Sequence, residues 1–538
     1  MKIINIAFSI SAMLLVMGAS AQDTTKRKTI EITSSFKPSL KPSAKVDFNP
    51  SAVGSDTVRP RLTYRVPIQN PSFQIYPASL KPAAIQPDTS SPYANSGYAK
   101  VGYGNFNTPY AAAAISFGDG RKSSGALQGN FISSKGKLTH QQYAKYGITG
   151  DALFAAGENS KLKAGASLEG FNTRKYGYQP DTLKFSKDQV FQRFTTFNVN
   201  AELSNNTPTE FGLTYAPAAS LWFFTDNNGG REGHFHIKAP LEKSLAENLK
   251  FGVDFQADLV NYKGKVFENK NNLYSITPSI TWANEVLVLK AGIMPSWDNG
   301  AFKLLPDVEL EAKVPEQPFM AIAGFKGYYD INSYRSMAGF NPWIAQPINV
   351  FNTCNSELYV GLKGNSGEHL SYMARVGYVH RNNVALFLND SSDGKTYRVT
   401  SEPTINSIRL QGEVSYQKAD AFYWNAGIKV QTFGSMKINK EAYGLIPVEI
   451  NSHVRAKIAK DFYFTADLFY FEGNHYKTKA ATGRTKVAID MNAGLEFKVA
   501  NNIGLWVQFN NLFNSQYQRW KQYQVLGFQA LGGVKFNF

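Results

Sequence analysis

The sequence contains almost no cysteine, few histidines and, after its first residues, no long apolar run. Its 538 residues include one cysteine and seven histidines. A single cysteine excludes an intramolecular disulfide framework and a cysteine-cluster metal site. No run after the N-terminus approaches the ~18 to 20 apolar residues that a membrane helix requires, which excludes a helical membrane protein. Glycine, tyrosine and phenylalanine are abundant instead, at 43, 28 and 38 residues. This composition predicts an all-β chain rich in turns and aromatic surfaces.

Familiar catalytic signatures are also missing. The sequence has no G-x-S-x-G elbow, no phosphate-binding P-loop and no H-E-x-x-H motif, so we expect no enzymatic activity and no cofactor. Glu232, His234 and His236 alternate along one strand face and include the residue types that bind zinc. Polar filling of a lumen is the favoured explanation for these residues, and we predict no metal site there. An enzyme built from scattered Asp, His and Ser residues stays an open alternative.

The first residues predict export. Lys2 precedes an apolar stretch from Ile3 to Val16, and Ala19-Ser20-Ala21 supplies a small-residue cleavage site before Gln22. Residues 1–21 are therefore a predicted signal peptide. A large exported chain without disulfides fits a bacterial envelope. The formal net charge of +16 is spread over strands and loops, so it predicts contact with anionic lipopolysaccharide or an anionic solute rather than with nucleic acid.

Residues 22–94 form a predicted extended arm. Ten of the 24 prolines lie between residues 22 and 92, a density that blocks helix interiors and central strands. Residues 22–66 carry nine Lys or Arg against four Asp or Glu. A Ser-Leu-Lys-Pro sequence occurs twice in this arm. It predicts two equivalent docking segments for a periplasmic or outer-membrane partner, although drift in a linker is the alternative. The residues are Ser39, Leu40, Lys41, Pro42, Ser79, Leu80, Lys81 and Pro82.

Strict alternation of apolar and polar residues dominates residues 95–538. In residues 249–259 every second residue is apolar, while Lys, Gly, Asp or Gln occupy the positions between them. The pattern returns at residues 408–416, 448–458 and 487–499. Such alternation is the period of a strand with one apolar and one polar face. Each segment is about 9 to 12 residues long, enough to cross a membrane at a tilt of ~45°.

These segments predict a transmembrane antiparallel β-barrel rather than a soluble sandwich. Sandwich strands average only ~5 to 6 residues, and a closed barrel satisfies every backbone hydrogen bond in lipid without leaving an edge. We expect aromatic residues near strand ends, such as Trp222-Phe223-Phe224, to form an interfacial girdle. The barrel has room for 18 to 22 strands, and we favour 22. An even number returns the C-terminus to the periplasmic side.

The polar faces of the strands would line the interior of this barrel. Rings of charged side chains confer selectivity on pores, so these residues are candidates for a solute path. A water-filled or salt-bridged interior without throughput would use the same residue types. The candidate lumen-lining residues are Lys250, Asp254, Asp258, Arg409, Glu413, Arg455, Lys457, Asp490 and Glu496.

The end of the chain carries the most recognisable pattern. Alternating aromatic residues lie on one face of the last segment, and the final residue is a phenylalanine. An Asn-Leu-Phe-Asn run precedes this segment. The pattern resembles the closing strands of TonB-dependent receptors, and residues 102–110 are similar to the barrel start of plugless relatives from Bacteroidota. The residues that carry the C-terminal signature are Asn511, Leu512, Phe513, Asn514, Phe536 and Phe538.

The resemblance implies an outer-membrane solute channel or transporter. TonB-dependent receptors normally carry a folded plug before the barrel, whereas fewer than 75 proline-interrupted residues occupy that place here. We therefore expect a barrel without a plug, and energy-coupled uptake does not carry over from the family. The alternative function is a non-transporting subunit of an envelope assembly, secretion or adhesion complex that docks partners through residues 22–94. In both cases outer-membrane lipids surround the barrel.

Overall fold

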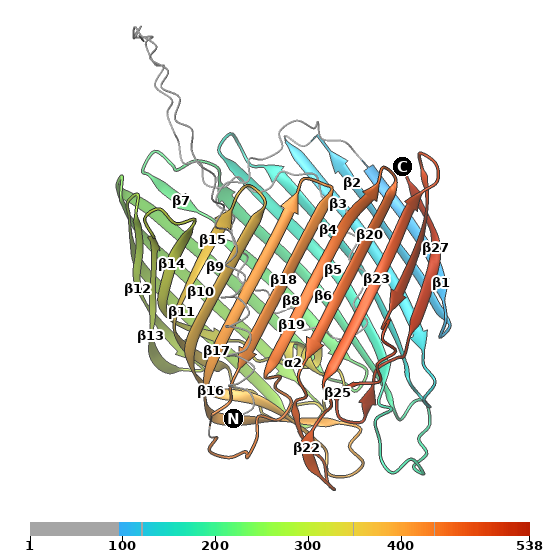
Figure 1. Cartoon of the computed structure of the whole chain (residues 1–538). Helices are drawn as coiled ribbons and strands as arrows, with labels where there is room; N and C mark the ends of the chain where they lie inside the picture. Colours follow the sequence, from blue (N-terminus) through green and yellow to red (C-terminus); the bar gives the residue numbers. More distant parts are fainter. Residues whose placement is uncertain (1–95, 120–121, 348, 435) are drawn as a thin grey trace, which may run out of the picture. The chain divides into compact units, whose positions relative to one another are not determined.

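The computed structural model describes residues 96–119, 122–347, 349–434 and 436–538. The predicted signal peptide and arm, with both Ser-Leu-Lys-Pro repeats, lie outside the described residues. Within these ranges the chain forms one closed antiparallel β-barrel (Figure 1). No helix in the described ranges is long and apolar enough to cross a bilayer.

The described elements follow one another as neighbouring hairpins around the wall. The first strands are β1 (Ser96–Gly104), β2 (Thr108–Gly118), β3 (Ser123–Lys135), β4 (Gln142–Ala155), β5 (Ser160–Arg174), β6 (Phe191–Asn205), β7 (Leu213–Tyr215), β8 (Ala218–Asp226), β9 (Arg231–Ala246) and β10 (Leu249–Lys263). The middle of the chain forms β11 (Glu268–Ala283), β12 (Leu287–Asp298), β13 (Ala301–Lys313), β14 (Phe319–Asp330), the helix α2 (Tyr334–Phe340), β15 (Thr353–Ser366), β16 (Leu370–Asn389), β17 (Tyr397–Lys418) and β18 (Phe422–Gln431). The last elements are β19 (Val448–Ala459), β20 (Phe462–Phe471), β21 (His475–Lys477), β22 (Thr482–Arg484), β23 (Ala488–Lys498), β24 (Ile503–Asn510), β25 (Gln518–Trp520), β26 (Tyr523–Gln524) and β27 (Gln529–Asn537).

The prediction of a 22-strand barrel is confirmed. The main sheet contains 23 named strands, but β7 and β8 both pair with β9 and are two parts of one wall strand. The barrel closes where β27 pairs with β1, from Tyr98 opposite Asn537 to Gly104 opposite Leu531. Phe538 extends this seam because its backbone exchanges hydrogen bonds of 2.7 and 2.9 Å with Gly97.

The alternation in the sequence becomes an outer apolar face and an inner polar face. Phe251, Phe255 and Phe536 are 37 to 47% exposed on the outside, which is the lipid-facing surface of an outer-membrane barrel. The expected aromatic girdle at Trp222-Phe223-Phe224 is wrong in part. Only Phe223 faces outward, whereas Trp222 lies against His234 and Phe224 is buried. The cause is the strand period, which turns the flanking residues inward.

Two strands are much longer than the predicted 9 to 12 residues. β16 has 20 residues and β17 has 22. Beyond Asn382, β16 no longer pairs with β15 and pairs only with β17. This end of the hairpin leaves the wall and is stabilised by its own small core, in which Val384, Leu386 and Ile405 are buried.

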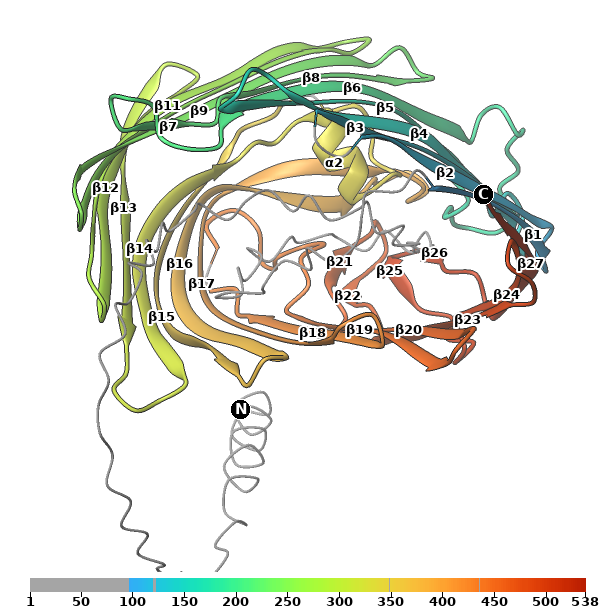
Figure 2. The same cartoon turned by 90° about the horizontal axis from the view of Figure 1, so that it is seen from above.

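The two rims of the barrel differ. Short turns and both ends of the described barrel lie at one rim, and the longer connections lie at the other. Outer-membrane barrels have short periplasmic turns and longer extracellular loops, which orients the chain. Two extracellular connections, residues 331–347 and 349–352 with α2, and 511–528 with β25 and β26, fold inside the ring of strands (Figure 2). The connection 472–487 carries β21 and β22, and β22 projects beyond the rim (Figure 1).

Candidate functional site

The inward-folded loops form a buried aromatic cluster that crosses the lumen. We call α2, the following residues 341–347 and 349–352, and the loop 511–528 the extracellular cap. Tyr334 and Met337 of the cap pack on Phe194 and Phe224 of the wall, and the same cluster reaches Phe387 on β16. Strands β6 and β8 lie nearly opposite β16 in the order of neighbouring strands. The cap therefore joins the wall at β6 and β8 to the end of the β16–β17 hairpin that leaves the wall.

Ring stacking holds the second half of the cap. Trp343 and Tyr523 stack with their ring centroids 3.8 Å apart. Trp520 contacts Phe387 and Tyr397 edge-on at 5.3 and 5.2 Å. Arg519 lies over the Trp520 ring at 4.2 Å and donates a hydrogen bond of 2.9 Å to the Gly444 carbonyl. Aromatic and cation–π pairs of this kind stabilise by roughly 0.5 to 2 kcal/mol each.

A wall carboxylate fixes the start of α2. Ser333 caps the helix with a reciprocal bond pair to Ser336. Glu232 on β9 accepts hydrogen bonds from the backbone N–H groups of Tyr334 at 2.5 Å and Arg335 at 3.2 Å. Charge-assisted bonds to free helix N–H groups are among the stronger ones in proteins. Glu232 thus couples the cap to the wall across about a hundred residues of sequence.

The Tyr334 hydroxyl makes a second connection to the wall. It donates a hydrogen bond of 2.6 Å to Asp226 at the end of β8, which also accepts one of 3.0 Å from Gln346 in the cap. Burial and the negative charge of Asp226 raise the pKa of Tyr334. The hydroxyl therefore stays protonated as a donor throughout the physiological range.

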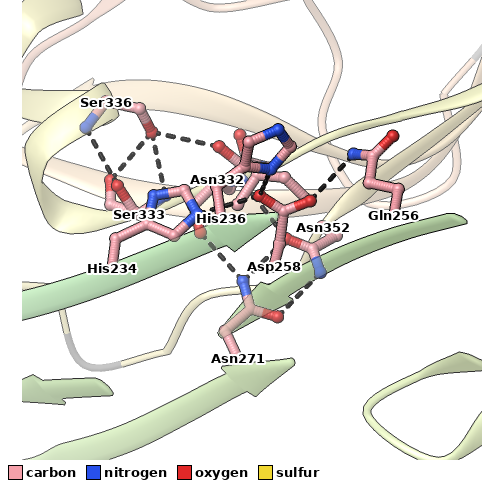
Figure 3. A network of polar contacts seen from close by, with 10 residues as sticks. His234, His236, Gln256, Asp258, Asn271, Asn332, Ser333, Ser336 and Asn352 are labelled. Atoms are coloured by element: carbon pink, nitrogen blue, oxygen red, sulfur yellow. Dashed lines mark hydrogen bonds and ion pairs between the residues drawn. The ribbon is translucent and has the colours of Figure 1, made fainter. Parts of the chain in front are cut away.

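Below the cap, two imidazoles share one buried carboxylate. His234 and His236 contact the same oxygen of Asp258 at 2.9 and 2.8 Å, and Gln256 donates to its other oxygen at 2.8 Å (Figure 3). Within the described ranges no three His, Cys, Asp or Glu side chains gather as metal ligands. The carboxylate is instead held by hydrogen bonds from the wall.

An asparagine network anchors the descending part of the cap. Asn271 on β11 and Asn352 exchange two side-chain hydrogen bonds of 2.7 Å. Asn271 also donates to the carbonyl of Asn332 at 2.9 Å (Figure 3). These contacts satisfy amides that are almost completely buried, which would otherwise be costly. They fix both ends of the segment that carries α2.

A cavity of about 650 Å³ lies between α2 and the inner face of the wall. Its wall residues come from β1 to β6 and β8, and α2 supplies Arg335. Lys145, Glu169 and Arg335 are the charged residues of this lining. Phe171, Phe194 and Phe224 give it an aromatic part. We call this space the lumen cavity.

The nine predicted lumen residues lie on β10, β17, β19 and β23 and are not gathered into one site. On β10, Lys250 pairs with Glu242 at 2.8 Å and Asp254 pairs with Lys238 at 3.3 Å. Both pairs are a third to a half exposed. Asp258 is the carboxylate shared by the two histidines.

The other predicted residues have partners spread around the wall. Arg409 pairs with Glu357 at 3.4 Å, and Glu413 accepts a bond of 3.0 Å from Asn425. Asp490 accepts one of 3.0 Å from Tyr517. The remaining contacts join Arg455 and Lys457 to the Tyr463 ring, and Glu496 to Lys100 and Lys535. A solute path along these residues stays a prediction.

Sequence reasoning missed the residues that hold the cap. Glu232 drew notice only as a candidate metal ligand, and Arg335 lies in a connection without any strand period. Trp222 was expected in the aromatic girdle, but the centroid of its ring lies 5.0 Å from the Arg335 guanidinium. No local pattern could have found these contacts because they join distant segments.

The C-terminal signature folds the start of the last extracellular loop. Asn511 and Asn514 adopt positive φ angles of 49°, which asparagine tolerates better than most residues. The Asn511 side chain bonds Ser515 and Leu526, and the Asn514 side chain accepts from the Phe528 N–H at 2.9 Å. Leu512 lies between these turns, and Phe513 is 51% exposed. Phe536 and Phe538 end the seam with their rings outward.

Comparison with family models and with curated proteins finds no match to the sequence. Solved structures do match the fold. The FrpB iron transporter from Neisseria meningitidis aligns with a TM-score of 0.63 at 10% identity, covering 83% of this chain and 82% of its own. The siderophore receptor PirA from Acinetobacter baumannii gives 0.61 at 9% identity, covering 82% and 80%. FpvA from P. aeruginosa, bound to heterologous pyoverdines, gives 0.61 at 11%, covering 83% and 72%.

The fold is that of an outer-membrane receptor barrel. The similar structures include an iron transporter and a siderophore receptor, and the exposed apolar belt agrees with a place in the outer membrane. At such low identity the likeness extends to the fold alone. The similar structures therefore say nothing about the roles of the residues in the cap and the lumen cavity.

Proposed function

We propose that this barrel is a gated solute transporter of the outer membrane. One observation carries the proposal: the cap is folded inside the mouth and joined to β6 and β8 of the wall and to the end of the β16–β17 hairpin, above a cavity lined by charged and aromatic residues. A purely structural anchor has no need of a closure built from its own loops. The iron transporters and siderophore receptors among the similar structures support transport over an enzymatic role.

Gating requires that the cap can leave the mouth while the wall stays intact. The wall is closed by backbone pairing of β27 with β1, which does not involve the cap. The cap is held chiefly by side chains, those of Glu232, Asp226 and the aromatic cluster, and by two backbone hydrogen bonds between residues 343–345 and Tyr397. Segments without a continuous backbone ladder open more readily than the strands that carry them. The mouth can therefore open without unfolding the barrel.

Planar-bilayer conductance of the full mature chain tests this function. Glu232→Ala removes the acceptor of the two N–H groups at the start of α2, so we expect more frequent or larger ion-conducting steps than in the parent chain. Glu242→Ala is the matched control, because this carboxylate pairs with Lys250 on the wall and is half exposed. Heat-modifiable gel mobility verifies that each variant is folded.

The outcomes separate the two candidate functions. Rare steps in the parent chain that become frequent only in Glu232→Ala support gated transport. A barrel that remains silent in all three proteins, and that purifies with other envelope proteins, favours a non-transporting subunit of a larger complex.

A further inference from the structure

Arg335 projects from α2 into the lumen cavity without an acidic partner. Its backbone is fixed by Glu232, but in the described parts of the chain no hydrogen bond or ion pair involves its guanidinium, and its Nε is buried. The group lies 5.0 Å from the centroid of the Trp222 ring. Burial lowers the pKa of Arg335, although Glu232 and Glu169 oppose this effect. A guanidinium offers five donors in a planar fork that matches carboxylate and phosphate oxygens.

The rest of the lining complements such a group. Lys145 supplies a second positive charge and lies 5.4 Å from the centroid of the Phe171 ring. Glu169 is the one carboxylate among the lining residues of the cavity. Tyr146 and Phe171 are half-buried aromatic residues of the lining, whereas Phe194 and Phe224 are almost completely buried against Tyr334 of α2.

The size and composition of the cavity suit an organic solute. A volume of about 650 Å³ falls within the ~300 to 1,000 Å³ of typical small-molecule sites, which combine apolar walls with a few placed polar groups. Neutral polar side chains, among them Gln128, Asn130 and Thr196, line the remaining wall. A metal ion is not favoured, because the cavity presents a single carboxylate and no histidine or cysteine.

We propose that the lumen cavity binds an organic anion with a flat apolar body, and that Arg335 holds its acidic group. The proposal rests on the proposed transport function and names the class of solute. Tyr146 and Phe171 would contact the body of the solute, and Lys145 would add to the favourable field. A carboxylate and a phosphate monoester present the same planar pair of oxygens to Arg335, so both belong to this class.

Calorimetry on the full mature chain in detergent tests the proposal, with detergent alone as the blank. The probes are 2-naphthoate and 2-naphthyl phosphate, which distinguish the two acidic groups. Neutral 2-naphthalenemethanol and the cationic 2-naphthylmethylamine are the matched comparisons. We expect saturable binding of at least one anionic probe and binding of the neutral and cationic probes weaker by about tenfold or more.

Substitutions assign the acidic group to Arg335. Arg335→Gln should weaken anion binding about tenfold, and Arg335→Lys should restore part of it. Glu169→Gln should strengthen anion binding because it removes the one negative charge of the lining. Arg398→Gln is the control, since this exposed arginine bonds only Ser391 among the described residues. Heat-modifiable mobility again verifies folding.

Several results would overturn the site. They are no saturable binding of either anion by the parent chain, equal binding of the neutral probe, or unchanged affinity in Arg335→Gln. Weaker anion binding in Glu169→Gln would also contradict the proposal. The binding test and the conductance test can fail separately. If the parent chain binds the anionic probes but Glu232→Ala shows no conductance, the transport function is contradicted and the binding site stands. If Glu232→Ala conducts but the parent chain does not bind the probes, only the binding site is contradicted.

Discussion

At the scale of single residues, the contribution of a wall side chain depends on whether it points outward to lipid or inward to the lumen. Neighbours along β10 have opposite roles: Phe255 is 37% exposed on the outside, while Asp254 faces inward and pairs with Lys238. The same rule corrected the expectation for Trp222, which the strand period turns toward Arg335. A substitution therefore has to be judged by the face on which its residue lies.

Phe255→Arg should destabilise the inserted barrel by roughly 2 to 4 kcal/mol, since a charge on the lipid face is costly near mid-depth. Asp254→Asn is the neighbouring control. It removes a partly exposed ion pair, which is worth less than about 1 kcal/mol. Urea unfolding of the chain in lipid vesicles measures both. Equal destabilisation by the two substitutions would contradict the assignment of faces.

At the scale of elements, the wall was largely predictable and the cap was not. The predicted segments 249–259, 448–458 and 487–499 lie in β10, β19 and β23 with nearly the same bounds, because a strand in lipid needs local alternation of apolar and polar residues. The cap has no such period. Its position depends on contacts such as Glu232 with Tyr334, which are 102 residues apart.

The closing seam also depends on contacts that no local pattern reveals. Gly102 on β1 lies opposite Gly533 on β27. A Cβ atom on Gly533 would lie 1.9 Å from the Val101 carbonyl oxygen, far closer than atoms pack. A Cβ atom on the adjacent Gly532 would lie 3.5 Å from its nearest neighbours, an ordinary contact. A side chain at position 532 therefore fits the seam, whereas one at position 533 does not.

Gly533→Ala should force β27 away from β1 and destabilise the barrel by roughly 1 to 3 kcal/mol, as overpacking does in a closely packed region. Gly532→Ala should have little effect. The folded fraction on unheated gels and the urea midpoint of each variant provide the measurement. A stable Gly533→Ala barrel with an unchanged midpoint would show that the seam has more room than its backbone geometry indicates.

At the scale of the whole molecule, the barrel is closed by its own strands and covered by its own loops. The β1–β27 seam and the aromatic cluster of the cap are made by residues between 96 and 538. The extended arm predicted at residues 22–94 is therefore not required for closure of the wall. Its repeated Ser-Leu-Lys-Pro segments, at residues 39–42 and 79–82, remain candidates for docking a partner or for contact with the lumen.

Deleting residues 26–84 should leave an inserted barrel, because the wall pairs without them. It should also either raise the conductance, if the arm obstructs the lumen, or release a co-purifying envelope protein, if the arm docks a partner. Heat-modifiable mobility, planar-bilayer recording and affinity purification of the full and shortened chains give the three measurements.

Replacing residues 26–84 by a Gly/Ser linker of equal length controls for tether length, since such linkers are flexible coils without apolar anchors. If the shortened, replaced and full chains insert equally and match in conductance and partners, the arm has neither role. A shortened chain that fails to insert would mean that the arm assists assembly of a wall whose final pairing it does not share.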